Sequence, residues 1–128
     1  MILLLDTSTP ICKFTLVDGD NKSSEDWQAD RTLARDLLKR LIAFLDANNS
    51  KISDLTGLGV FMGPGSFTGL RIGLTVLNTI ADSENIPIVG GKGEAWEGEA
   101  LAKLQAGQDD KIVLPFYGAG ARITSPKK

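Results

Sequence analysis

Two short polar stretches have residue types that suit phosphate binding. The first, Asp6 to Thr9, places a carboxylate and three hydroxyls directly after an apolar run. The second, Gly63 to Ser66, places two glycines, a proline and a serine between an apolar run and a long amphipathic segment. Serine is a favoured helix N-cap, so the first-turn amides that follow Ser66 can bind its hydroxyl, water or an anion. The candidate phosphate-facing residues of the second stretch are therefore Gly63, Gly65 and Ser66, and those of the first stretch, which follow from the order of elements in the chain, are Asp6, Thr7, Ser8 and Thr9.

A structural interpretation of the same residues stays open, because the side chains of such a turn often bond their own backbone. The glycine stretch is not a P-loop, which needs a lysine that is missing here, and G-x-G-x-x-G would need glycine where Thr68 stands. The sequence has no histidine, which excludes Ser-His and Cys-His pairs and HExxH zinc sites. Its one cysteine, Cys12, falls in an expected strand, so we interpret it as a core residue. We predict no catalytic residue and no metal site.

Composition suits one globular domain. The chain has 128 residues, 42% of them hydrophobic, and no apolar run approaches the roughly 18 residues of a membrane helix. We therefore expect a cytoplasmic protein without a membrane contact. The net charge of −2 argues against a free-standing nucleic-acid binder, so we expect any RNA to be held by another chain.

Hydrophobic periodicity predicts an α/β fold. We expect strands at 2–6, 12–17, 22–29, 58–62 and 86–90, and helices at 32–48, 66–83 and 94–105. The first three strands should form antiparallel hairpins and the last two should be parallel to the first, giving a mixed five-stranded sheet in the order 3-2-1-4-5. The run 112–117 is a short strand or an extended segment. We expect a single domain over 1–106, and an extended segment with a mobile tail over 107–128.

The two long helices carry broader apolar arcs than one sheet face needs. In the second helix, Gly69 and Gly73 leave a notch where another element can approach closely. Either the first helix or a partner chain fills this notch, and the sequence leaves both open. On the partner interpretation, Gly73→Leu weakens association and leaves the fold intact. The candidate interface residues are Leu33, Leu37, Leu41, Gly69, Ile72, Gly73, Val76 and Ile80.

The order of elements is that of one half of the actin-like (ribonuclease H-like) ATPase fold. In that fold an acidic residue at the end of the first strand and the adjoining hairpin amides face a nucleotide phosphate and its metal, which is the role this likeness implies for Asp6 to Thr9. Three stretches add a family resemblance: ILLLDTST from Ile2 to Thr9, GPGSFTGLRIG from Gly63 to Gly73, and IPIVG from Ile86 to Gly90. With them, residues 1 to about 91 resemble the TsaB (YeaZ) family, and 114–128 is similar to the way its members often end.

The resemblance implies a role in making threonylcarbamoyladenosine in tRNA. It implies a catalytically silent protein that docks through the two long helices onto a TsaD-type subunit, which holds ATP and metal, with a TsaE-type ATPase as a further partner. This chain itself is then expected to need no cofactor and to contact tRNA only indirectly. The apolar area of the two long helices predicts in addition that it forms a homodimer when alone.

The chain departs from the family in two places. Most of the second half of the fold is replaced by Gly91 to Lys111, and Thr32 or Leu33 stands where a histidine is common. Because the nucleotide lies between the two halves of that fold, the shortening weighs against independent ATP hydrolysis. The alternative is a minimal phosphate-binding ATPase or kinase-like enzyme; a metallopeptidase is excluded by the lack of histidine.

Overall fold

The computed structural model describes residues 1–116. Its sheet has the order β3-β2-β1-β4-β5, with β1 antiparallel to β2 and parallel to β4, as the sequence predicts. The strands are β1 (Ile2–Asp6), β2 (Ile11–Asp18), β3 (Asn21–Gln28), β4 (Gly57–Gly63) and β5 (Ile88–Lys92). The helices are α1 (Leu33–Ala47), α2 (Phe67–Glu84) and α3 (Trp96–Gln105).

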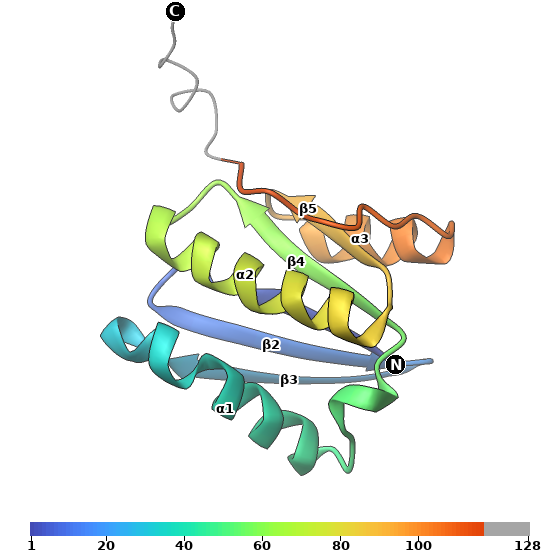
Figure 1. Cartoon of the computed structure of the whole chain (residues 1–128), viewed down its shortest axis with the longest axis horizontal. Coiled ribbons are helices and arrows are strands. Elements are labelled where there is room, and N and C mark those ends of the chain that lie inside the picture. Colours follow the sequence, from blue (N-terminus) through green and yellow to red (C-terminus); the bar gives the residue numbers. More distant parts are fainter. Residues whose placement is uncertain (117–128) are drawn as a thin grey trace, which may run out of the picture.

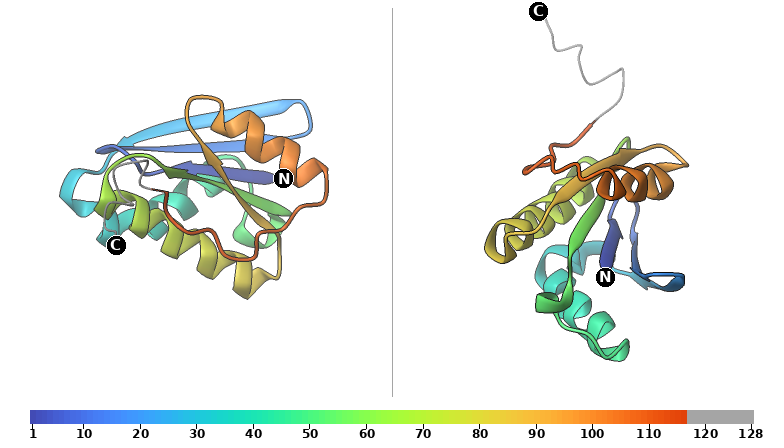
Figure 2. Two further views of the ribbon diagram at one scale, coloured as in Figure 1. Left: turned by 90° about the horizontal axis from the view of Figure 1, so that it is seen from above. Right: turned by 90° about the vertical axis from the view of Figure 1, so that its right-hand side faces the viewer.

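Helices cover both faces of the sheet. The helices α1 and α2 contact each other on one face, as predicted, and α3 lies on the other (Figures 1 and 2). Phe14 of β2 stacks on Phe44 of α1 with ring centroids 5.5 Å apart, whereas Phe61 of β4 meets Trp96 of α3 edge to face at 5.7 Å. Among the described residues no helix is long and apolar enough to cross a bilayer.

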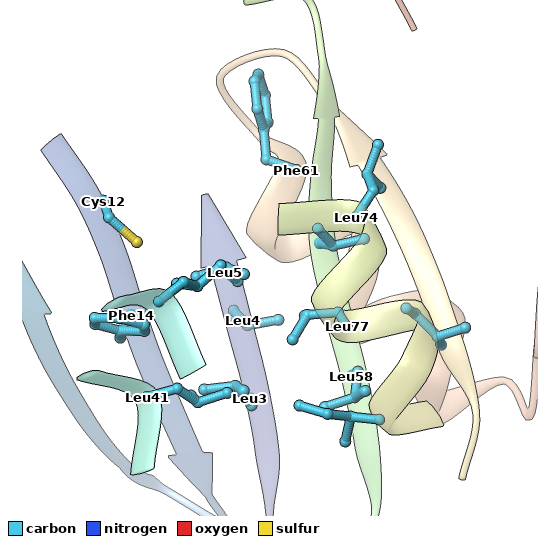
Figure 3. Packing of buried hydrophobic residues seen from close by; sticks show 14 of the residues in the cluster. Leu3, Leu4, Leu5, Cys12, Phe14, Leu41, Leu58, Phe61, Leu74 and Leu77 are labelled. Carbon is cyan, nitrogen blue, oxygen red and sulfur yellow. The ribbon is translucent and has the colours of Figure 1, made fainter. Parts of the chain in front are cut away.

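The apolar core lies on both faces of the sheet: it fills the space under α3 and, on the other face, the space between the sheet and the α1/α2 layer. Alternate residues of the central strands, including Leu3, Leu5 and Leu58, point from the sheet into this layer (Figure 3). Cys12 is fully buried, which confirms its interpretation as a core residue. The broad helical arcs are thus largely covered within the chain itself.

The predicted interface residues are mostly covered within the chain, and their role in an interface stays a prediction. Most of the candidate interface residues are buried inside the single chain, and two are half-buried, so the set as a whole is not a free surface. The buried ones are Leu33, Leu37, Leu41, Gly69, Gly73 and Ile80, and the half-buried ones are Ile72 and Val76. The sequence argument considered the sheet, α1 and a partner as cover for α2, and it did not consider the turn that follows β1.

The notch in α2 is filled by Thr7, from the turn that follows β1. A Cβ added at Gly73 would meet the Thr7 side chain, and one added at Gly69 would meet the Thr7 carbonyl oxygen. Neither α1 nor a partner is needed to fill it. We therefore expect Gly73→Leu to disturb this turn and to lower stability, because the added side chain would collide with Thr7.

The final described segment, residues 108–116 (the strap), runs along β5 and α2 without forming a strand. Asp110 N donates to Ile88 O at 2.8 Å, and Phe116 N donates to Met62 O. Of the two interpretations left open for 112–117, residues 112–116 fit the extended segment rather than the strand. The expected mobile tail falls on 117–128, outside the described residues, and the division at 106 stays a prediction.

Candidate functional site

In the turn at the end of β1, the side chains of Asp6, Thr7 and Thr9 form hydrogen bonds with the chain's own backbone. Asp6 Oδ1 accepts from Ser8 N at 2.8 Å, and Thr9 Oγ1 donates to Ile11 O at 3.0 Å. Thr7 Oγ1, which is buried, donates to Gly69 O at 2.6 Å. These bonds favour the structural interpretation of the turn, and a phosphate-facing role for its residues stays a prediction.

The two polar stretches meet in space, because β1 and β4 are neighbours and end at the same edge of the sheet. Ser66 N donates to Ser8 O at 2.9 Å, and a Cβ on Gly65 would overlap Ser8. Ser66 caps α2 as predicted, its Oγ accepting from Gly69 N at 3.3 Å. Gly63 lies apart from this contact, against the carbonyl oxygen of Phe116.

A groove of about 870 Å³ lies beside this contact, between the starts of α1 and α2 (the helix groove). Its lining combines the connection from β3 to α1 with the first turns of α2. The lining residues are Thr9, Pro10, Gln28, Ala29, Asp30, Arg31, Thr32, Leu33, Ala34, Ser66, Thr68, Gly69 and Ile72. Sequence reasoning found five of them as candidates: Thr9, Leu33, Ser66, Gly69 and Ile72. It missed 28–32, a polar connection without a motif.

An exposed apolar stripe continues along α1 from the helix groove. Ala34 lines the groove, and Leu38 and Ile42 follow at four-residue spacing with 47% and 49% of their surface exposed. Residues four apart share one side of a helix. The interface predicted from the sequence named the buried Leu33, Leu37 and Leu41 of this helix and did not include Leu38 or Ile42.

The site offers little for chemistry of its own. Burial, and secondarily the charges of Asp6 and Asp26, raises the pKa of Cys12 to about 12, so its thiol stays protonated at neutral pH. Within residues 1–116, no three cysteine or carboxylate side chains are grouped so as to hold a metal ion. What the arrangement presents is a groove and an apolar stripe, which are features of a binding surface.

Residues 27–92, a little over half of the chain, match the family model described as "TsaD: tRNA N6-adenosine threonylcarbamoyltransferase". Two similar proteins are both named tRNA threonylcarbamoyladenosine biosynthesis protein TsaB. The one from Haemophilus influenzae is 30% identical over 69% of this chain and 37% of its own length. The one from Escherichia coli K12 is 28% identical over 70% of this chain and 38% of its own length.

Solved structures give the same result. YeaZ from Pseudomonas aeruginosa superposes with a TM-score of 0.69 at 28% identity, over 83% of this chain and 49% of YeaZ. A protein described as similar to peptidase YEAZ from Pseudomonas aeruginosa gives 0.67 at 30% identity, over 71% of this chain and 42% of its own. This chain thus spans well under half of the length of the TsaB relatives. By these matches the chain belongs to the TsaB (YeaZ) members of the family that the TsaD model describes.

Proposed function

We propose that this protein takes part in tRNA threonylcarbamoyladenosine biosynthesis as a non-catalytic partner of a TsaD-type subunit. The names of its TsaB relatives supply the pathway. In support of a non-catalytic role, the hydroxyls of Thr7 and Thr9 and the carboxylate of Asp6 are engaged with backbone atoms. ATP and metal are then held by the partner subunit.

The observation that carries the proposal is the apolar stripe of α1 beside the helix groove. Leu38 and Ile42 are two of the seven large apolar side chains that are exposed within residues 1–116. Ile72 of α2 lines the same groove as Ala34 of α1, so both helices contribute to one surface. A groove flanked by two parallel-running helices suits an incoming helix, whose apolar face would cover the stripe. The docking surface is therefore this exposed stripe with the helix groove, and not the buried leucines.

The test is association with the TsaD-type subunit encoded by the same genome. Leu38→Asp puts a charge at the centre of the stripe and should weaken the complex about tenfold or more, measured by titration calorimetry. Ile112→Asp is the matched control, because Ile112 is equally an exposed aliphatic residue but lies on the strap, and it should bind like the unmodified protein. Equal affinities for the two variants would refute the docking surface.

Activity tests the assignment to the pathway. The TsaD-type subunit with its other required proteins should modify tRNA only when this chain is added, and this chain alone should neither transfer the threonylcarbamoyl group nor hydrolyse ATP appreciably. Turnover of ATP by the pure chain that disappears in Asp6→Ala would support the ATPase alternative instead. Without a partner, the same surface should pair two copies, which sedimentation at several concentrations would detect.

A further inference from the structure

A second groove runs along α2, between this helix and the strap (the strap groove). Its volume is about 360 Å³. It is lined by Arg71, Leu74, Thr75 and Asn78 of α2 and by residues 113–115 of the strap. None of these residues lines the helix groove, which uses other positions of α2. The strap groove is therefore separate from the docking surface proposed above for α1.

The strap side of this groove exposes a large apolar side chain. Leu74 and Val113 line the groove and are almost fully buried, whereas Leu114, which also lines it, is 67% exposed. This is the highest value among the exposed large apolar side chains of residues 1–116. Covering Leu114 with apolar groups of another molecule would remove that surface from water, which favours binding.

The helical wall of the groove has a definite length. Arg71, Thr75 and Asn78 follow one another on α2 at spacings of four and three residues, so their side chains share one side of the helix. Seven residues of an α-helix rise by about 10 Å, which is also the length of about two turns of an incoming helix. The groove thus suits a short helical segment that lies along α2.

Two cations at this groove have no acidic partner within residues 1–116. Arg71 lines the groove, and Lys92 lies over the ring of Phe116, the residue that follows the lining segment of the strap. Neither cation belongs to an ion pair of the described chain. Glu99 accepts a hydrogen bond from the backbone N of Lys92, but its carboxylate is paired with Lys103 at 3.0 Å. Carboxylates of an occupant would complement both cations.

An acidic protein segment fits these features better than two other occupants. A second copy across a two-fold axis would bring each cation toward its counterpart, which is unfavourable. A nucleic-acid strand would stack bases on aromatic faces. However, the Arg71 guanidinium lies 5.2 Å from the ring centroid of Phe67, and Lys92 Nζ lies 4.5 Å from that of Phe116, so a cation of this chain already covers one face of each ring.

We propose that the strap groove binds a short amphipathic helix of a protein partner, with an apolar side chain of that helix against Leu114 and its carboxylates paired with Arg71 and Lys92. The partner is thus recognised by an acidic segment of about two turns. This adds a second binding surface to the protein, on α2 and the strap, and it does not depend on the docking surface of α1.

The experiment is an NMR titration of the ¹⁵N-labelled full chain with two synthetic helical peptides of about 14 residues, or four turns. Both carry leucines along one side, and the other positions are glutamate in the acidic peptide and lysine in the basic one. We expect the acidic peptide to shift the amides of Arg71, Thr75 and Leu114 in a saturable manner. The basic peptide should bind about tenfold more weakly or less.

Two substitutions test the two parts of the contact. Leu114→Asp removes the exposed apolar side chain, and Arg71→Glu reverses the charge, so each should lower affinity for the acidic peptide about fivefold or more. The matched controls are Ile42→Asp and Lys39→Glu on α1, which make the same kinds of change outside the groove and should leave this affinity unchanged. The amide spectrum of each variant also shows whether it is folded.

Several results would overturn the proposal. Equal binding of the two peptides would exclude recognition of acidic groups, and shifts confined to α1 would place the contact elsewhere. Stronger shifts of the groove amides with oligouridine than with the acidic peptide would indicate a nucleic-acid occupant, and shifts that depend on protein concentration alone would indicate a second copy. Because no TsaD-type subunit is present, failure here would leave the docking surface on α1 intact, and failure of that docking would leave the strap groove intact.

Discussion

The turn at 6–9 and the strap at 108–116 both contact α2. They are held against this helix in different ways. The turn is packed into α2, with Thr7 in the notch between Gly69 and Gly73 and nearly inaccessible to solvent. The strap is tied to α2 by a pair of hydrogen bonds: Val113 N donates to Asn78 Oδ1, and Asn78 Nδ2 donates to Val113 O, both at 2.9 Å.

The strap also exposes more of its side chains to solvent than the buried Thr7 of the turn does. In the strap, Val113 is buried against the position of Gly90, whereas Ile112 and Leu114 are 64% and 67% exposed. Two carboxylates of the strap accept hydrogen bonds from the backbone of β5: Ile88 N donates to Asp109, and Gly90 N donates to Asp110. Close packing over buried surface resists opening more than a few partly exposed hydrogen bonds do. We therefore expect the turn to belong to the global folding unit and the strap to open separately.

Among the changes predicted here, Gly73→Leu should have the largest effect on stability, because it disturbs the packed turn. The new side chain would be forced into Thr7, so we expect the free energy of unfolding to fall by about 3 kcal/mol, the upper end of the usual cost of overpacking. Urea denaturation followed by circular dichroism measures it.

The matched control is Gly98→Ala in α3, where an added Cβ meets nothing within 4 Å. That substitution should raise stability by about 0.5–1 kcal/mol, because alanine is the better helix former. If Gly73→Leu is as stable as the unmodified protein, the packing of Thr7 in the notch does not hold the turn.

Thr7→Val tests the hydrogen bond within the same contact. Valine keeps the shape of the side chain but cannot donate to Gly69 O, so we expect a loss of about 0.5–1.5 kcal/mol in the free energy of unfolding. The exposed Thr79 of α2, changed to valine, is the control, since its hydroxyl bonds Thr75 O at the surface. A cost that is the same for both variants would mean that burial of the Thr7 hydroxyl does not matter.

Some features of these two regions can be predicted from the sequence and others cannot. The strand order and the Ser66 cap follow from periodicity and local chemistry, so they were predictable. The glycine spacing in α2 correctly indicated a close approach, but a single sequence does not tell which element approaches, and the answer is Thr7, which lies 66 residues before Gly73.

The candidate surface was harder to predict for the same reason. In α1, Leu37 and Leu38 are identical in type and adjacent, yet one is fully buried and the other is half exposed. The angle at which α1 lies on the sheet decides between them, and that angle depends on packing of residues far apart in the sequence. The attachment of the strap through Asn78 and Asp109 likewise has no sequence motif.

Asn78→Ala should release the strap with a smaller effect on the whole molecule. Both bonds to the backbone of Val113 would be lost, so amide exchange of Val113 should accelerate at least tenfold, while the exchange of core amides such as Leu58 changes much less. Native-state hydrogen exchange followed by NMR makes the measurement, and Thr75→Ala on the same helix is the control. Equal acceleration at Val113 and Leu58 would show that the strap and the core unfold as one unit.

The smallest effect is expected from pH, through Asp109. The hydrogen bond from the Lys111 backbone N–H does most to lower the pKa of this carboxyl below its ordinary 3.8, partial burial opposes the shift, and the bond from Ile88 N–H adds to it. Because the folded-state pKa is lowered, the carboxylate contributes stability at pH values above its unfolded-state pKa. That contribution is lost as pH falls through the lowered folded-state pKa, so the strap should loosen only below about pH 4.

The amide resonance of Ile88, which donates to Asp109 Oδ1 at 3.2 Å, reports this titration directly. In an NMR titration it should shift with an apparent pKa below 3.8, and in Asp109→Asn the shift should disappear because the amide side chain does not titrate. Asp18→Asn, at the distant hairpin of β2 and β3, should leave the Ile88 titration unchanged. If Ile88 titrates identically in Asp109→Asn, another acid controls the edge of β5. The strap is then attached by the Asn78 bonds without a contribution from this carboxylate.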